Sequence, residues 1–289
     1  MSLIRRGFLY SLSLCSSGLL WGCTTIAMPV AGQDAISALV SKCETEFRQG
    51  KIEQALATVT NAIQQSPDRP EAWNARGFIY AFQERKDEAL DDFIRAVRLD
   101  HANSTYQNNL GIAYLESGNN DLALLAFNEA MQWGPQSART LKHRGMAYRH
   151  LGKLDEAMGD LNAAAALDDR DATVYANRAV IHALRQQYHE AKRDLDHAAD
   201  LDGALPEVYQ SRGLVEMLLG RFDEAEKDFS QALALGTEDN ALVYNRGVAR
   251  SILGDSTGAQ EDYARACQEG YQPACGSTRF ISRPVESKL

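Results

Sequence analysis

Small and apolar residues return at fixed places in this chain every 34 residues, without an insertion, from about residue 36 to residue 269. A fixed period of this length indicates a repeat array, in which one supersecondary unit is copied and stacked on its neighbours. Four columns share this register: Gly77, Gly111, Gly145, Ala179, Gly213 and Gly247; Ala89, Ala123, Ala157, Ala191, Ala225 and Ala259; Phe93, Phe127, Leu161, Leu195, Phe229 and Tyr263; Ala96, Ala130, Ala164, Ala198, Ala232 and Ala266. The columns predict an all-α, elongated body instead of one or two globular domains.

Each period encodes two short helices and a tight turn. In the period 138–171, Leu141 and Tyr148 lie at helical spacing, and Gly152 then ends the pattern. Acidic residues open the second helix, where the helix dipole favours them, and Leu161 begins its apolar stripe. One such pair of helices cannot bury its apolar face alone, so successive pairs must stack.

The first 33 residues do not share the repeat and have the layout of a signal peptide. Arg5 and Arg6 precede an apolar run over residues 8–20, which is shorter than the roughly 20 residues that span a bilayer. The pair Arg5-Arg6 followed by Phe8-Leu9 resembles a twin-arginine export signal, although ordinary secretory signals also carry arginine pairs. We therefore expect an exported protein and leave its export route open.

A second motif in the leader, Leu20-Trp21-Gly22-Cys23, resembles a bacterial lipobox. The resemblance predicts lipidation of Cys23, and Thr24 after it favours sorting to the outer membrane. The competing prediction is a cut after Ala31 or Gly32, which releases a soluble periplasmic protein. The membrane is expected as a partner only through this lipid anchor.

Charge and cysteine content narrow the class of partner. The formal charge is −9, and removal of Arg5 and Arg6 with the leader makes it −11, which argues against nucleic-acid binding. Cys43 shares the column of Gly77, so we expect a buried core thiol. Cys267 and Cys275 flank a predicted turn over 268–274, and in an oxidising compartment they would form a disulfide. Without export they would be two ordinary thiols.

The repeat resembles the tetratricopeptide repeat, which has the pattern Trp-x2-Leu-Gly-x2-Tyr followed by Ala, an aromatic residue, Ala and Pro. Here one copy reads Trp73-x2-Arg76-Gly77-x2-Tyr80, with Ala89, Phe93 and Ala96 behind it. The resemblance implies a right-handed superhelical solenoid over residues 36–269, between a leader of 33 residues and a tail over 270–289. We count seven repeats, which begin near Ile36, Pro70, Ser104, Ala138, Ala172, Pro206 and Asn240.

One departure from the family pattern predicts ion pairs inside the repeats. Where the family has Leu, five repeats have Arg, and the residue sixteen positions later is then Asp; the repeat with Leu110 has Ala126 there. Arginine suits this pairing because its guanidinium binds a carboxylate through two parallel hydrogen bonds. The alternative is that both charges are solvated and match by common ancestry of the repeats. The predicted pairs are Arg76–Asp92, Arg144–Asp160, Arg178–Asp194, Arg212–Asp228 and Arg246–Asp262.

By the same resemblance, the first helix of each repeat lines a concave groove that binds partner segments. In the fourth repeat the groove positions form one basic stripe, which is unusual in so acidic a chain and suggests a partner with acidic or carboxylate-bearing segments. A solvated stripe without a ligand is the alternative. The stripe is Arg139, Lys142, His143, Met146, Arg149 and His150; further groove candidates are Asn108, Asn109, Asn177 and Tyr244.

No enzyme motif accompanies the repeat, since the chain has no glycine-rich nucleotide loop, zinc-protease helix or nucleophile elbow. We expect no catalytic activity, metal or cofactor. The family resemblance favours a scaffold of the bacterial envelope, similar to outer-membrane lipoproteins that hold peptidoglycan hydrolases or proteases. A pilotin-like assembly factor for a pilus or secretin is the second interpretation, and an enzyme or carbohydrate-binding groove is a distant third. A homodimer is a further option that the sequence leaves open.

Overall fold

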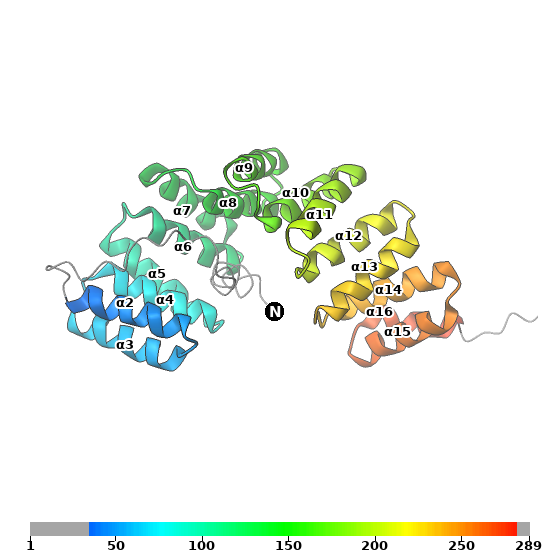
Figure 1. Ribbon diagram of the computed structural model, residues 1–289, viewed down its shortest axis with the longest axis horizontal. Coiled ribbons are helices and arrows are strands. Elements are labelled where there is room, and N and C mark those ends of the chain that lie inside the picture. The colour runs from blue at the N-terminus through cyan, green and yellow to red at the C-terminus, as the bar shows by residue number, and fades with distance from the viewer. Residues whose placement is uncertain (1–34, 282–289) are drawn as a thin grey trace, which may run out of the picture. The chain divides into compact units, whose positions relative to one another are not determined.

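The computed structural model describes residues 35–281, and the side chains to residue 276, all of them in helices and turns (Figure 1). The predicted leader, with Arg5, Arg6 and the lipidation candidate Cys23, lies outside the described residues. Seven hairpins of 13- or 14-residue helices follow one another, and one shorter helix ends the series. The first three hairpins and the start of the fourth are α2 (Ala35–Arg48), α3 (Ile52–Gln65), α4 (Pro70–Phe82), α5 (Lys86–Leu99), α6 (Ser104–Glu116), α7 (Asn120–Trp133) and α8 (Ala138–His150). The rest are α9 (Leu154–Leu167), α10 (Ala172–Leu184), α11 (Tyr188–Leu201), α12 (Pro206–Leu218), α13 (Phe222–Ala234), α14 (Asn240–Leu253), α15 (Ser256–Gln268) and α16 (Gln272–Ile281).

The first helix of every hairpin begins within one residue of a predicted repeat start, which confirms the register read from the sequence. Local chemistry fixes several of these starts. Pro70 and Pro206 occupy the first turn of their helices, where a missing N–H costs nothing. Asn103 and Asp171 accept backbone N–H groups at the next helix start, as good N-caps do.

The turn inside each hairpin requires a left-handed backbone. Gly118 and Gly152 adopt φ values of +76° and +74° there, conformations that glycine reaches without strain. Two repeats place other residues in the same column, Glu84 at φ +63° and Gln186 at φ +60°. A residue with a Cβ pays about 1 kcal/mol for this conformation, which the packed hairpin must offset.

The column of small residues lets the two helices of a hairpin approach closely. A Cβ placed on Gly111 would lie 2.5 Å from the buried ring of Phe127, and one on Gly213 would lie 2.6 Å from Phe229. The repeat with Ala179 carries Leu195 in place of the aromatic residue, so the extra methyl group faces a smaller neighbour. Alanine thus occurs in this column where the facing residue is leucine, although the fourth repeat combines Gly145 with Leu161.

The described residues form two compact bodies, an N-terminal body over residues 35–153 and a C-terminal body over residues 154–281. The sequence predicts one uninterrupted array, and the division falls in the turn of the fourth hairpin, where its register is unbroken. Within each body, the closest packing of the described helices is inside a hairpin and between adjacent hairpins, as a solenoid requires.

Within each body the first helices of successive hairpins lie closer to one another than the second helices do. In the N-terminal body α2, α4, α6 and α8 make this row; in the C-terminal body α10, α12 and α14 make it. The closer row is the inner, concave side of each curved stack. Side chains that leave this row away from the second helices therefore line the groove that the family resemblance implies.

The C-terminal tail contains a helix that the sequence analysis does not predict. Helix α16 packs against α15, and Ala274 is buried with Val243 and Ala266. Cys267 and Cys275 are joined by a disulfide with an S–S distance of 2.01 Å, the bridge expected for an exported chain. The predicted turn over 268–274 is shorter in the structure, where residues 269–271 connect the helices.

Cys43 is buried in the core of the first repeats, and burial, followed by the nearby carboxylates Glu44 and Glu46, raises the pKa of its thiol to about 12. It is the core thiol that the sequence predicts, because a thiol with this pKa stays protonated and unreactive at neutral pH. Among the described residues, no helix combines the length and apolar character needed to cross a membrane.

Candidate functional site

Helix α8 carries the predicted basic stripe, and the whole helix contains no Asp or Glu. Arg139 and His150 are exposed, while Lys142, His143 and Arg149 are partly exposed. The stripe thus presents up to three permanent positive charges from one helix of the inner row. Met146 differs from the prediction, because it is buried in the core between α6 and α8 and offers the groove almost no surface.

The histidines of the stripe are held by their neighbours. His143 Nδ1 lies 2.8 Å from the carbonyl oxygen of Arg139, and its ring stacks on Phe127 at 6.2 Å between centroids. His150 Nδ1 lies 3.1 Å from Asn120 Oδ1, and its Nε2 lies 2.9 Å from Arg149 Nη2. Burial and then the charge of Arg149 lower the pKa of His150. His150 is therefore neutral at pH 7, donating from Nδ1 and accepting at Nε2.

Arg149 is the most unusual charge of the stripe. Its Nε–H is fully buried and has no hydrogen-bond partner among the described residues. Burial also lowers the pKa of its guanidinium, because the charged form loses hydration. A buried, unsatisfied donor on a cation is energetically costly, so an acceptor supplied from outside would be stabilised here.

The two asparagines on α6 join neighbouring helices and offer little exposed surface. Both are buried, contrary to their prediction as open groove contacts. Asn108 Oδ1 accepts the hydroxyl of Thr140 at 3.0 Å, and Asn109 Nδ2 donates to Asn74 Oδ1 at 2.9 Å. These bonds link α4, α6 and α8, so the asparagines hold neighbouring inner helices in register.

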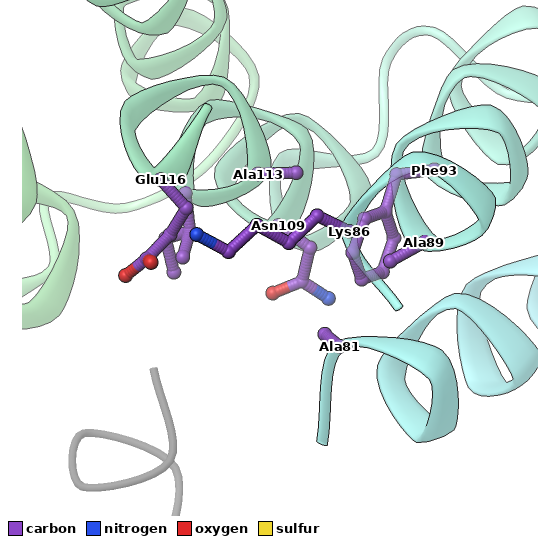
Figure 2. A pocket seen from close by; sticks show the side chains of 8 residues that line it. Ala81, Lys86, Ala89, Phe93, Asn109, Ala113 and Glu116 are labelled. Atoms are coloured by element: carbon purple, nitrogen blue, oxygen red, sulfur yellow. The ribbon is translucent and has the colours of Figure 1, made fainter. Parts of the chain in front are cut away.

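A small cavity of about 10 Å³ lies beside Asn109, with Lys86 and Glu116 at its edge (Figure 2). This volume is close to the minimum for a single water molecule. Figure 2 shows the Lys86 side chain reaching across Asn109 towards Glu116. Burial raises the pKa of Glu116 to about 7, and the positive charge of Lys86 only partly opposes this effect. The acid next to the basic helix is thus partly protonated at neutral pH.

The two groove candidates of the C-terminal body are only partly available. Asn177 donates through Nδ2 to the carbonyl oxygen of Thr173 at 2.7 Å. Tyr244 lies 5.4 Å, centroid to centroid, from both Tyr263 and Tyr271 and packs on the core beneath α16. Tyr271 and the start of α16 therefore pack on Tyr244, which is half-buried.

Four of the five predicted ion pairs lie within one body each, and all four are formed. Every guanidinium donates through Nε and Nη2 to both carboxylate oxygens, at distances of 2.6–2.9 Å. These hydrogen bonds raise the pKa of each arginine above its usual value. The pairs are Arg76–Asp92, Arg178–Asp194, Arg212–Asp228 and Arg246–Asp262. The fifth, Arg144–Asp160, would join residues of different bodies and stays a prediction.

The structure adds a contact that the repeat pattern alone does not predict. Nη1 of four arginines in this column, from Arg144 to Arg246, donates to the residue sixteen positions earlier, on the second helix of the preceding hairpin. Arg178, Arg212 and Arg246 thus each join the two helices of their own hairpin and link that hairpin to the one before. The acceptors are Asn128 for Arg144 at 2.7 Å, Asn162 for Arg178 at 3.0 Å, Asp196 for Arg212 at 3.1 Å and Ser230 for Arg246 at 3.3 Å.

One repeat supplies the signal that could have revealed this bridge. The hairpin with Leu110 in place of arginine has Ala126 sixteen residues after it and Ile94 sixteen residues before it. Where the arginine is missing, the two positions that hold its polar partners in other repeats carry an apolar or small residue instead. In the part of the chain that the structure describes, no cluster of His, Cys, Asp and Glu side chains could hold a metal ion.

Comparison with known proteins agrees with this architecture. In solved structures, a tetratricopeptide repeat protein from Parabacteroides merdae matches with a TM-score of 0.65 and 19% identity, over 86% of this chain and 99% of that one. The Cut9–Hcn1 structure of the APC/C matches with a TM-score of 0.76 and 15% identity, over 97% and 54%. PilW, a type IV pilus biogenesis factor, matches with a TM-score of 0.64 and 18% identity, over 70% and 95%. At these identities the likeness concerns the fold alone.

No curated protein matches the sequence. The sequence pattern of the tetratricopeptide repeat matches residues 44–104, 79–138, 108–172 and 211–272, together more than half of the chain. With helices paired and stacked in the same register within each body, the chain belongs to the tetratricopeptide repeat family.

Proposed function

We propose that this protein is a non-catalytic scaffold of the bacterial envelope that binds acidic or carboxylate-bearing segments of partner proteins on α8. The family supports protein partners in general. The location rests on the leader sequence, which resembles an export signal with a lipobox at Cys23. The scaffold is exported, and either anchored to the outer membrane through Cys23 or soluble in the periplasm.

The observation that carries this proposal is the unsatisfied Nε–H of Arg149 on a helix without acidic residues. A carboxylate accepts from Nε of an arginine in the planar geometry that the guanidinium favours. Arg139 and Lys142 lie on the same face, at the spacing of successive helical turns. The partly protonated Glu116 on the neighbouring inner helix opposes an incoming anion less than a fully charged acid would.

Among possible partners, we favour hydrolases and proteases of the peptidoglycan layer, which the resemblance to envelope scaffolds suggests. A second candidate role is assistance in the assembly of a pilus or secretin. The likeness in fold to the pilus biogenesis factor PilW favours that role. Both roles use a groove and an export signal, so only the identity of the partners separates them.

The experiment is an envelope pull-down that compares the wild-type chain with the variant Arg139→Glu, Lys142→Glu, Arg149→Glu. A matched control reverses three exposed cations away from the groove, Arg193→Glu, Lys227→Glu and Arg265→Glu. We expect partners to be lost from the α8 variant and kept by the control. Loss of hydrolases or proteases supports the wall-remodelling role, and loss of pilus or secretin subunits supports the assembly role. An unchanged set of partners in the α8 variant would refute binding on this helix.

A probe of defined chemistry separates the carboxylate from other features of a partner. Peptides recovered from the pull-down can be titrated with a free C-terminal carboxylate and with an amidated C-terminus, and with Asp and Glu changed to Asn and Gln. We expect neutralisation to weaken binding to the wild-type chain by at least about tenfold, the loss of one good charged hydrogen bond. Equal affinities of charged and neutral peptides would contradict the role assigned to Arg149.

A further inference from the structure

Exposed large apolar side chains gather in two places on this protein. Nine such side chains occur among the described residues, and seven of them belong to two groups. One group lies on the inner row of the C-terminal body, and the other lies on α7 of the N-terminal body. Single exposed apolar residues are ordinary, but clusters on two separate surfaces need a physical reason.

The first group, which we name the apolar array, comes from three successive inner helices. Leu184, Leu218 and Ile252 share the thirteenth position of their repeats and are 57%, 59% and 55% exposed. Leu214 lies one helical turn before Leu218 and is 41% exposed, and Val180 and Val248 share its column. Because α10, α12 and α14 contact one another in order, this periodicity lines the side chains up across the inner face.

The array is almost free of charge. The other groove positions of α10, α12 and α14 carry Thr, Ala, Asn, Gln, Ser, Met and Tyr, and Glu207 is their one acidic residue. The matching thirteenth positions of the N-terminal body are Arg48, Phe82, Glu116 and His150. The inner row of the C-terminal body is therefore suited to an uncharged, aliphatic surface and would disfavour a charged one.

The second group, which we name the α7 patch, lies in two columns that carry a charge in most other repeats and a large apolar residue in none of them. Leu122 and Leu125 are 44% and 62% exposed on the second helix of the third repeat, one turn apart. Trp133, 44% exposed, ends the same helix, and its indole N–H donates to Glu129 at 3.0 Å. The column of Leu122 is Glu88, Glu156, Glu190 and Glu224 in other repeats, and that of Leu125 is Asp91, Arg193, Lys227 and Glu261.

We propose that the α7 patch of one copy docks on the apolar array of a second copy. The two surfaces match in chemistry: each is apolar, and each replaces charges that the same columns carry elsewhere in the chain. Their shapes also suit each other, because a helix with apolar side chains one turn apart can lay its apolar face into an apolar groove between helices. A second copy is the one occupant for which the chain itself supplies a fitting surface.

The contact is heterologous, since the patch and the array are different surfaces. Each copy then keeps one unused patch and one unused array, so association continues until the chain of copies closes or stops. A few side chains on each surface bury less than the roughly 1,200–2,000 Å² of a stable interface. The association is accordingly weak and dependent on concentration, in the micromolar range or above.

The test uses residues 33–289, the soluble mature form predicted from the sequence, in sedimentation equilibrium from about 10 to 300 µM. One variant disables the patch, Leu122→Glu with Leu125→Glu. The other disables the array, Leu214→Glu with Leu218→Glu. A matched control, Gln54→Glu with Ala57→Glu, places the same charges in the same exposed columns of the first repeat. Circular dichroism checks that each variant keeps the helical content of the wild type.

We expect the mean mass of the wild type and the control to rise with concentration, and each double variant to stay monomeric alone. A mixture of the two double variants should form a complex of two chains and nothing larger, because the intact patch of one meets the intact array of the other. A wild type that stays monomeric at every concentration overturns the proposal. So does a folded double variant that still associates, and so does a mixture that stays monomeric.

Discussion

The contacts of Arg212 with Asp228 in its own hairpin and with Asp196 in the preceding one, which we call the arginine bridge, allow a quantitative prediction. The guanidinium donates to both carboxylate oxygens, at 2.9 and 2.7 Å, and to Asp196 at 3.1 Å. The Arg212 side chain is 21% exposed and that of Asp228 is 10% exposed. Because Arg212→Leu leaves a largely buried carboxylate without its cation, we expect it to lower the free energy of unfolding by about 3 kcal/mol. Asp228→Ala should cost about 2 kcal/mol, since Arg212 keeps its bond to Asp196.

The double variant should cost far less than the two single changes together. The third repeat already carries Leu110 and Ala126 in these columns, so the hairpin accepts the apolar pair. Removal of both charges at once leaves neither of them buried alone. We expect Arg212→Leu with Asp228→Ala to cost about 2 kcal/mol instead of about 5, which is a coupling energy of about 3 kcal/mol.

The assay is equilibrium urea unfolding, with hydrogen exchange of α12 and α13 as a local readout because repeat arrays can open in parts. The matched control is Arg193→Ala, whose partner Glu190 lies 3.3 Å away but whose side chains are 74% and 42% exposed. An exposed pair of this kind is worth less than about 0.5 kcal/mol. Additive single variants, or a loss at Arg212 no larger than at Arg193, would refute the bridge as a stabilising element.

Three further predictions concern packing, the disulfide and pH. Gly111→Ala should lower the free energy of unfolding by about 2 kcal/mol, because its Cβ would lie 2.5 Å from Phe127. Gly159→Ala has open space around it and should raise the free energy of unfolding by about 0.5–1 kcal/mol. Thermal unfolding measures both changes. Cys275→Ser should cost about 2.5 kcal/mol, seen as faster hydrogen exchange in α16. Burial raises the pKa of Glu116 from 4.5 to about 7, so the stability of the wild type should fall as pH rises across that interval. At pH 8 the Glu116→Gln variant should be more stable than the wild type by about 1–3 kcal/mol in urea unfolding.

Each of these predictions has a clear contrary result. Equal effects of the two glycine substitutions would mean that the close approach of the helices does not limit the size of the residue. Unchanged exchange in α16 would mean that the terminal helix is held by its apolar contacts without the disulfide. A stability difference between wild type and the Glu116 variant that does not change from pH 5 to pH 8 would contradict the raised pKa.

The sequence alone determined the helices of the seven repeats, their starts and their register, but not the terminal helix α16. These features depend on local chemistry: the left-handed turn residue, as at Gly152, recurs in all seven repeats, and a proline opens two of them, at positions 70 and 206. The seven repeats of the chain could also be compared with one another, position by position. The joint loss of arginine and aspartate around Leu110 predicted the ion pairs before any distance was known.

Only the tertiary structure decided which side chains reach the groove and how neighbouring hairpins are joined. Met146, Asn108 and Asn109 occupy groove positions by count, yet the adjacent inner helices bury them. The bond from Arg212 to Asp196 crosses between hairpins. Burial and contacts between repeats depend on the distance and angle at which whole helices pack, and a periodic sequence pattern specifies the face of a helix but not how closely its neighbour approaches.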